Sequence, residues 1–235
     1  MTGENQGPIG GGESAADKIG IVAGLASEAA LAARLPGTCV VCSGGRPDRA
    51  AALAAALADQ GVRGLISFGI AGGLVADAVS GLVIVAEAVV ADDERYDADA
   101  GWSIALARRL EAGLGVIAAS RVIVADPAAK RALQQRHGGV VVDMETLAVA
   151  RAAARRGLPW TAIRAVADPV TFTLPPAALV ALTAAGRPDL PAVLAAIARR
   201  PGQIPDLIRL ARASQAAHRG LLGGVNRLVG GGGLL

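Results

Sequence analysis

The sequence is poor in several residue types, and each shortage argues against a class of protein. Five aromatic side chains in 235 residues are too few for the stacking surfaces that bind single-stranded nucleic acid. The two cysteines lie within one apolar run and both histidines lie far from them, so no zinc site is expected. No run of about twenty apolar residues is present, which argues against a membrane-spanning helix. We expect a cytoplasmic protein with reduced core thiols, no metal and no nucleic-acid partner.

Small apolar residues are plentiful instead. Apolar residues make up 53% of the chain, with alanine and valine prominent among them, and glycine adds 31 further residues. Side chains of this size let helices pack closely on a buried sheet. We therefore predict one α/β domain with a mixed, largely parallel sheet and helices on both faces. This domain should span residues 18–229, after a disordered glycine-rich leader (1–17) and before a flexible tail (230–235).

Apolar runs and helical patterns alternate along the chain. Strands are predicted at 18–25, 39–45, 62–69, 81–90, 114–126, 140–142 and 159–168. Helices are predicted at 26–35, 46–61, 101–113, 127–138 and 143–157, with further helices interrupted by prolines toward the C-terminus. The glycine-rich segment 69–74 and the polar segment 91–99 are expected to be loops.

Polar residues follow several of the predicted strands. In sheets of this kind ligands bind beyond the carboxyl ends of the strands, so these residues are the candidates for a site. They are Glu28, the segment 43–46, the segment 69–73, the segment 143–145 and Asp168. Each has a simpler interpretation when taken alone. Asp143 is suited to cap a helix, Glu28 to lie exposed on one, and Asp168 to form a turn before Pro169.

The ordered set of motifs carries more information than any one of them. The segments "IGIVAGLASE", "SGGR", "GIAGGL", "ERYDAD", "VDMETLAVA" and "RAVAD" follow one another along the chain. In this order they resemble the nucleoside phosphorylase and nucleosidase superfamily, especially the methylthioadenosine/S-adenosylhomocysteine nucleosidases, over about residues 18–185. The C-terminal "RPDL" and "RRPGQIPDLIRLAR" look most like hopanoid-biosynthesis-associated phosphorylases. That branch is thought to remove adenine from adenosylhopane.

The resemblance implies roles for four residues around a bound nucleoside. Met144 would pack against the ribose, and Glu145 would accept hydrogen bonds from its hydroxyl groups. Asp168 would deliver a proton to N7 of the purine, and such a general acid contributes ~10²–10⁴-fold to the rate. Glu28 matches the glutamate with which the nucleosidases orient their attacking water.

The same resemblance gives expectations for the base and the nucleophile. Val122 and Ile123 fall near the base-contacting segment of the family. Phosphorolysis needs donors for phosphate, and these are expected from Ser43, Gly44, Arg46 and Gly69. Ile70 departs from the family pattern, since the nucleosidases carry a hydroxyl residue at this position.

The resemblance therefore implies phosphorolysis of adenosylhopane, with inorganic phosphate as co-substrate and no cofactor. A hydrolytic nucleosidase is the first alternative, and a non-catalytic nucleoside-binding protein is the second.

From residue 187 onward the chain carries seven arginines and two acidic residues. These helices are expected either to be solvated or to contact an anionic membrane surface where a lipid-linked nucleoside resides. The resemblance also implies a homo-oligomer.

Overall fold

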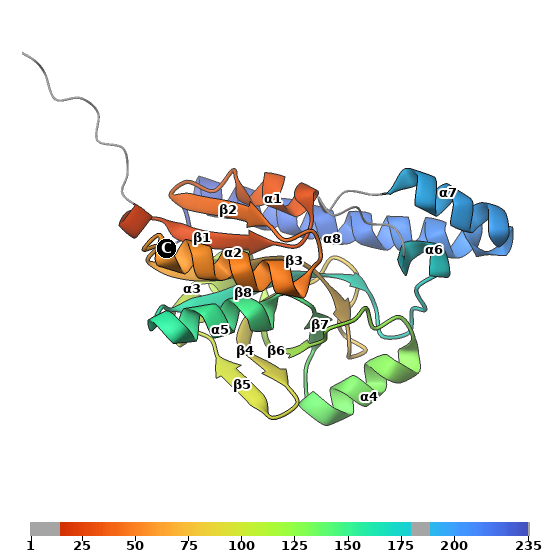
Figure 1. Cartoon of the computed structure of the whole chain (residues 1–235), viewed down its shortest axis with the longest axis horizontal. Coiled ribbons are helices and arrows are strands. Elements are labelled where there is room, and N and C mark those ends of the chain that lie inside the picture. The colour runs from red at the N-terminus through yellow and green to blue at the C-terminus, as the bar shows by residue number, and fades with distance from the viewer. Residues whose placement is uncertain (1–14, 180–188, 235) are drawn as a thin grey trace, which may run out of the picture.

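A mixed eight-stranded sheet forms the centre of the molecule (Figure 1). The computed structural model describes residues 15–179 and 189–234. The strands are β1 (Ile19–Ala23), β2 (Thr38–Cys42), β3 (Gly64–Gly73), β4 (Val83–Ala91), β5 (Glu94–Asp97), β6 (Gly113–Ala119), β7 (Val141–Asp143) and β8 (Trp160–Asp168). Apart from β5, each is close to a strand predicted from the sequence. The predicted fold class is confirmed.

The strand order explains why β8 is central. It runs parallel to β3 on one side and antiparallel to β4 on the other, and all nine of its residues are buried. From β4 the pairing continues to β6 and β7, and β7 returns to β3. Strands β3, β8, β4, β6 and β7 thus pair in a closed ring, while β1 and β2 extend the sheet beyond β3.

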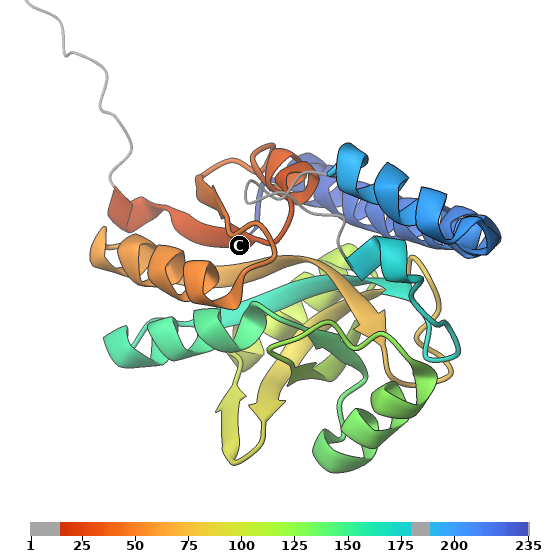
Figure 2. The same cartoon turned by 45° about the vertical axis from the view of Figure 1, so that its right-hand side comes forward.

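Helices cover both faces of this sheet, and each face has its own apolar cluster. Helices α2 (Pro47–Asp59) and α5 (Thr146–Arg156) pack together on one face. Helices α1 (Ala26–Ala32), α3 (Ala100–Leu110) and the C-terminal half of α8 (Ile204–Gly230) cover the other. Figures 1 and 2 show the two layers of helices on either side of the strands. Helix α4 (Pro127–His137) lies apart from both layers, beside the ends of β6 and β7.

The N-terminal half of α8 extends beyond the sheet together with two shorter helices (Figure 2). These are α6 (Pro176–Leu179) and α7 (Leu190–Arg199), and the 3₁₀ turn η2 (Pro201–Gln203) joins α7 to α8. The buried side chain of Gln203 connects them, because its Oε1 accepts from Ala177 N at 3.0 Å and its Nε2 donates to Ala196 O at 2.9 Å. Among the described residues, no helix is long and apolar enough to cross a membrane.

Three segments differ from the sequence-based prediction. Residues 121–126 form a loop and not a strand, because the Ser120 hydroxyl bonds to the backbone of Val122 (2.6 Å to O) and turns the chain away from β6. The expected loop 91–99 contains β5, which pairs with β4 through a tight turn at Asp92 (φ 41°). The expected glycine loop at 69–74 is largely the end of β3, where a bulge lies between Ala71 and Gly72.

The chain ends and the two cysteines also differ from the sequence-based prediction. Most of the predicted leader lies outside the described residues, but Ala15–Asp17 forms a short 3₁₀ helix, η1. The expected flexible tail packs on the body, since Leu234 is buried in the same cluster as α1 and α8. Cys39 and Cys42 are half-buried and not deep in the core, because β2 is an edge strand.

Candidate active site

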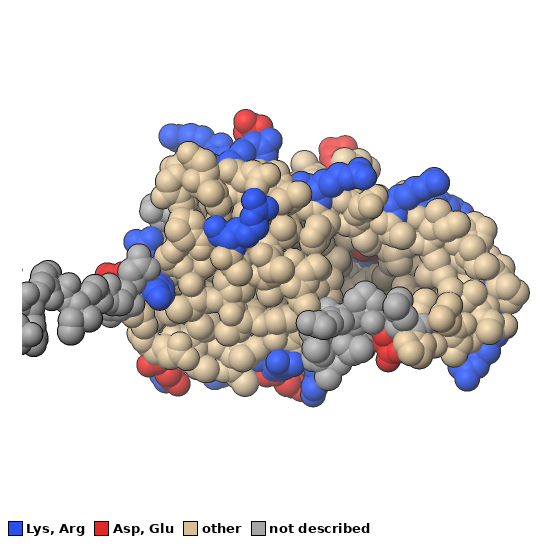
Figure 3. All heavy atoms as spheres, turned by 90° about the horizontal axis from the view of Figure 1, so that it is seen from above, with Lys and Arg blue, Asp and Glu red and all other residues tan. Residues whose placement is uncertain are grey.

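A cavity of about 350 Å³ lies at the carboxyl ends of β1, β3, β7 and β8, and α6 and α8 close its far side. Figure 3 shows the surface hollowed between the sheet region and the C-terminal helices. Six predicted site residues line this cavity: Glu28, Val122, Ile123, Met144, Glu145 and Asp168. Most of the remaining lining is apolar or glycine, including Leu25, Ile70, Leu174 and Leu210. Polar residues from several strand ends therefore line one cavity.

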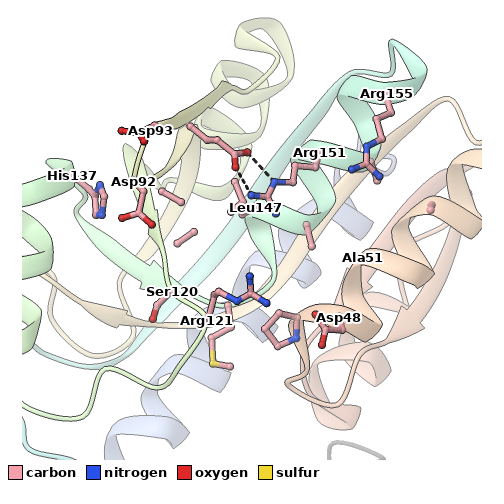
Figure 4. A pocket seen from close by; sticks show the side chains of 18 of the residues that line it. Asp48, Ala51, Asp92, Asp93, Ser120, Arg121, His137, Leu147, Arg151 and Arg155 are labelled. Atoms are coloured by element: carbon pink, nitrogen blue, oxygen red, sulfur yellow. Dashed lines mark hydrogen bonds and ion pairs between the residues drawn. The ribbon is translucent and has the colours of Figure 1, made fainter.

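A larger hollow of about 650 Å³ lies beside α2, α5 and β5 (Figure 4). Its wall is charged, and Arg151 is held there by Glu94, with Arg151 Nε 2.9 Å from Glu94 Oε2. Of the predicted site residues, only Met144 reaches it. Because it lacks the buried carboxyl groups, we assign the candidate active site to the smaller cavity.

Glu145 is the buried carboxyl group next to Met144 in the cavity wall. It precedes α5 directly and is 7% exposed. Burial raises the pKa of this carboxyl to about 7, against an attraction from Arg164 and with repulsion from Asp143 and Glu28. Glu145 is thus poised to change its charge near neutral pH, and its charged form is the one that accepts hydrogen bonds from sugar hydroxyls.

Arg164 lies beneath the carboxyl groups and was not predicted. It comes from the middle of β8, is 1% exposed, and forms an ion pair with Asp143. Its guanidinium also donates to Ser67 Oγ at 2.6 Å and to Thr146 Oγ1 at 3.1 Å, and lies 3.6 Å from Glu145. A buried arginine of this kind compensates buried carboxylates, which would otherwise be very costly to desolvate. It gives the acidic end of the cavity a fixed geometry.

Asp143 lies at the start of α5, where its sequence position suggests a helix cap. It is buried, and its side chain accepts from the Thr146 backbone N–H at 3.3 Å and from the Thr146 hydroxyl. It therefore caps the start of α5 while pairing with Arg164.

Glu28 is buried, although its position on a helix would by itself predict exposure. Its carboxyl accepts from Leu25 N at 2.7 Å and from Ile70 N at 2.9 Å. Burial raises the pKa of Glu28, and the charge of Arg164 opposes this rise. A Cβ on Gly69 would lie 2.6 Å from Glu28 Oε2, so this glycine makes room for the carboxyl group. Gly69 thus acts on Glu28 and does not itself line the cavity.

Asp168 lies at the end of β8 and is 8% exposed. Burial raises the pKa of its carboxyl, while the charge of Lys130 opposes this rise. Lys130 is fully buried, and its Nζ lies 2.5 Å from Asp168 Oδ2. A Cβ on Gly72 would be in ordinary van der Waals contact with the same carboxyl oxygen, at 3.4 Å. Asp168 therefore borders the cavity as a largely buried carboxyl group in contact with a buried lysine.

The two residues expected to contact the base belong to the loop after β6. Val122 and Ile123 are 69% and 45% exposed and line the cavity near Asp168. Large exposed apolar side chains at the mouth of a cavity are suited to an apolar or flat aromatic ligand.

The predicted phosphate cradle is only partly brought to the cavity. Gly45 lines it, whereas Ser43, Gly44 and Arg46 do not. Ser43 is fully buried and its hydroxyl has no hydrogen-bond partner within the described part of the chain. Arg46 is exposed and precedes α2.

The two buried cations of the site differ in how far the sequence signals them. An arginine inside the apolar run "TAIRAVAD" is a signal for a buried ion pair, because a central strand leaves no room for a solvated charge. Lys130 gives no such signal in the polar segment "AAKRALQQRH". Leu210 and Ser214 line the cavity from α8, which only the folded chain reveals.

Buried carboxyl groups at strand ends that face one small-molecule cavity are typical of the active sites of α/β enzymes. A family model described as Phosphorylase superfamily matches residues 32–185, which is more than half of the chain. The chain belongs to this superfamily.

Solved structures of nucleosidases share the fold. An S-adenosylhomocysteine nucleosidase from Streptococcus pyogenes, in complex with 5-methylthiotubericidin, superposes with a TM-score of 0.63 at 19% identity, covering 91% of this chain and 98% of that one. A 5'-methylthioadenosine/S-adenosyl homocysteine nucleosidase from Helicobacter pylori gives 0.64 at 17% identity, covering 91% and 99%. A futalosine hydrolase mutant from the same organism gives 0.57 at 20%, covering 64% and 89%. A search of curated proteins gives no match.

Glu145→Gln tests the buried charge through stability. The carboxyl has a raised pKa in the folded state, so its contribution to stability is present at low pH and is lost as the pH rises through about 7. Glutamine has no such loss. The melting temperature of the variant relative to wild type should therefore rise by roughly 4 °C between about pH 5 and about pH 8. Calorimetry at both pH values measures this, with the exposed Glu87→Gln as control. A difference that does not change with pH contradicts the assignment.

Proposed function

We propose that the protein cleaves the N-glycosidic bond of an adenine nucleoside that carries a large apolar 5′ substituent, with adenosylhopane as the leading candidate. One observation carries the proposal: Glu145 and Asp168, remote in sequence, line one cavity that continues as an apolar space against α6 and α8. The nucleosidases that share the fold include complexes with nucleoside analogues, which supports a nucleoside ligand here.

The proposed reaction needs two carboxyl groups in different protonation states, one protonated and one ionised. As the C1′–N9 bond breaks, its electron pair passes to the base, and protonated Asp168 gives a proton to N7 so that adenine leaves neutral. The sugar develops positive charge, which ionised Glu145 stabilises while it holds the ribose hydroxyls. The raised pKa of Asp168 supports the protonated state that this role requires. Met144, beside Glu145, supplies an apolar surface for the sugar.

Inorganic phosphate is the nucleophile that we propose first. Gly44 and Gly45 both have φ near 72°, which glycine adopts without strain, and they lead from β2 into the N-terminus of α2. Backbone N–H groups at such a position favour anions. The further donors of this segment are the exposed side chain of Arg46 and the Ser43 hydroxyl, which has no hydrogen-bond partner among the residues that the structure describes.

Water is the second candidate, and the charges of the cavity favour it. Among the described residues that line the cavity there is no lysine or arginine, whereas Glu28, Asp143 and Glu145 are carboxyl groups. A phosphate dianion is repelled by ionised carboxylates at close range. A buried glutamate with a raised pKa is suited to act as a general base on water, and Glu28 is such a group.

A single assay separates the two nucleophiles. Adenosylhopane, or adenosine with a 5′-alkylthio chain, is incubated with the protein in ¹⁸O-labelled water with and without phosphate. Phosphorolysis predicts adenine release that requires phosphate and a sugar 1-phosphate as product. Phosphate-independent release with ¹⁸O at C1′ assigns the protein to the hydrolases. Glu28→Gln should then lose most of the turnover, whereas a phosphorylase should lose less, and Glu87→Gln should change neither.

The same assay tests whether the protein is an enzyme. Asp168→Asn should slow adenine release by roughly 10²–10⁴-fold, because the general acid is removed. If the wild-type protein binds the nucleoside but releases no adenine, or if Asp168→Asn releases it unchanged, the non-catalytic binding protein becomes the correct interpretation.

The 5′ substituent is proposed to run toward α8. Leu174, Ala178, Leu210 and Ser214 line this side of the cavity and offer it almost no charge. An apolar chain gains free energy by leaving water here, whereas a charged substituent such as an amino acid finds no partner.

Leu210→Glu tests the direction of the substituent. A carboxylate on this wall should lower kcat/KM for adenosine with a long 5′-alkylthio chain by about 10-fold or more, and for adenosine itself by less than about 3-fold. Gln215→Glu, on the exposed side of α8, is the matched control. Equal losses for both substrates would place the substituent elsewhere.

A lipid-linked nucleoside would bring the protein to a membrane surface. The helices beside the cavity carry side chains that are suited to contact such a surface. Leu194, Ile204 and Ile208 are large apolar residues that are 66%, 42% and 48% exposed on α7 and α8. Exposed arginines lie on the same two helices and the turn between them: Arg199, Arg200, Arg209 and Arg212. Figure 3 shows basic groups along this end of the molecule. Apolar and cationic groups together favour the surface of an anionic membrane.

Vesicle sedimentation tests this contact. The protein should sediment with vesicles that contain about 30% anionic lipid, and binding should weaken in neutral vesicles and at high salt. The double variant Leu194→Ser, Ile208→Ser should remain in the supernatant, whereas Ile104→Ser, which removes an exposed apolar residue from α3, should bind like wild type. Wild type in the supernatant in every case would refute the contact. Oligomerisation remains a prediction from the resemblance.

A further inference from the structure

Helix α4 is attached to the rest of the molecule in an unusual way. It is a polar helix, and its one buried residue is a lysine, Lys130, which is 0% exposed. Lys130 and Lys18 are the only lysines among 23 lysine and arginine residues in the chain. A buried ammonium group is very costly unless its charge and its three N–H donors are satisfied. This position therefore needs an explanation.

The contacts of Lys130 converge on the end of β8. Its Nζ lies 2.5 Å from Asp168 Oδ2 and 2.9 Å from Pro169 O. Two further carbonyl oxygens, those of Asp168 and Phe172, lie at 3.3 Å and 3.4 Å. Four acceptors around three donors hold the ammonium without water. Lys130 thus fixes both the Asp168 carboxyl and the backbone that follows it.

The same lysine joins two segments that border the cavity. The loop that carries Val122 and Ile123 leads directly into α4, where Asp126 caps the helix by accepting from Ala129 N at 2.8 Å. The segment after β8 reaches back to this loop, since Leu174 N donates to Ala125 O at 2.8 Å. An inserted lysine at this junction keeps the expected base-contacting loop and the expected proton donor at a fixed distance.

Lys130 does not line the cavity, so it acts on a ligand only through Asp168. One carboxyl oxygen of Asp168 is engaged by the ammonium, and the carboxyl still borders the cavity. The other charged groups of the site, Glu28, Glu145 and Arg164 with its partner Asp143, form a separate cluster that perturbs its own members and not Asp168. The charge that faces Asp168 is that of Lys130.

We propose that Lys130 is a positioning residue for the reaction: it holds Asp168 by Oδ2 so that the other carboxyl oxygen faces the purine, and its charge stabilises the carboxylate that remains after proton transfer. The proposal rests on the proposed function. In the step itself the Asp168 O–H bond breaks, the proton binds N7, and the C1′–N9 pair passes to the leaving base. The negative charge left on Asp168 is then neutralised by the adjacent ammonium.

Lys130→Met removes the charge and keeps the length of the side chain. It should lower kcat for adenine release by roughly 10–10²-fold with little change in KM, because the acid is misplaced and its conjugate base is no longer stabilised. Lys130 opposes the rise in the pKa of Asp168, so its loss should move the alkaline limb of the kcat/KM profile to higher pH. Lys18→Met is the matched control and should change neither quantity.

A double variant separates positioning from a merely structural effect. Lys130→Met with Asp168→Asn should be about as slow as Asp168→Asn alone, because Lys130 acts through Asp168. An alkaline limb that does not move, or losses that multiply in the double variant, would overturn the proposal. If Lys130→Met does not fold, Lys130→Gln retains two N–H donors for the carbonyl oxygens and carries the same test. Wild type that releases no adenine refutes the proposed function instead, so the two failures are distinguishable.

Discussion

The ion pair between Arg164 and Asp143 is the interaction on which the acidic end of the cavity depends. Three carboxyl groups, Glu28, Asp143 and Glu145, are buried within reach of one guanidinium. Without that positive charge, the uncompensated desolvation of these carboxylates would destabilise the folded state, and the ends of β3, β7 and β8 would not close around a cavity. With it, Asp143 remains paired while burial raises the pKa of Glu28 and Glu145. One structural ion pair thus leaves two carboxyl groups available for chemistry.

The other end of the cavity follows the same principle with a different cation. Lys130 balances Asp168 from the side opposite to the cavity, as Arg164 does for the acidic cluster. In both places the cation is buried behind the carboxyl group, so the cavity itself presents acids and apolar surface. This arrangement favours a neutral ligand that develops positive charge during reaction, which describes a nucleoside losing its base.

The strand pattern was enough to predict the fold class and to select the main acids as candidate site residues. Apolar runs such as "RAVAD" end at a polar residue, and in sheets of this kind ligands bind beyond the carboxyl ends of the strands. Glu145 and Asp168 line one cavity because the end of β3 pairs with both strands that lead to them. Gly72 lies opposite Val142 of the antiparallel β7 and opposite Asp168 of the parallel β8. The segment 121–126 was wrongly predicted as a strand, because its apolar residues face a cavity and not a neighbouring strand. Periodicity cannot distinguish these two reasons for being apolar.

What the sequence could not give is the pairing across long distances. Lys130 precedes Asp168 by 38 residues, and Leu210 and Ser214 reach the cavity from a helix that begins beyond α7. Each contact depends on how α4 and α8 are placed against the sheet, which no local pattern encodes. Ser43 and Arg46 illustrate the converse, since only Gly45 of the motif that suggests a phosphate cradle lines the cavity.

The most direct measurement is a crystal structure of the protein with a C-nucleoside analogue of adenosine, whose glycosidic bond cannot be cleaved. The account predicts one nucleoside in the cavity below α8, with a carboxyl oxygen of Asp168 at hydrogen-bond distance from N7 and the Glu145 carboxyl on the ribose hydroxyls. Density for the ligand in the hollow beside α5, or a bound nucleoside that touches only one of the two carboxyl groups, would contradict it.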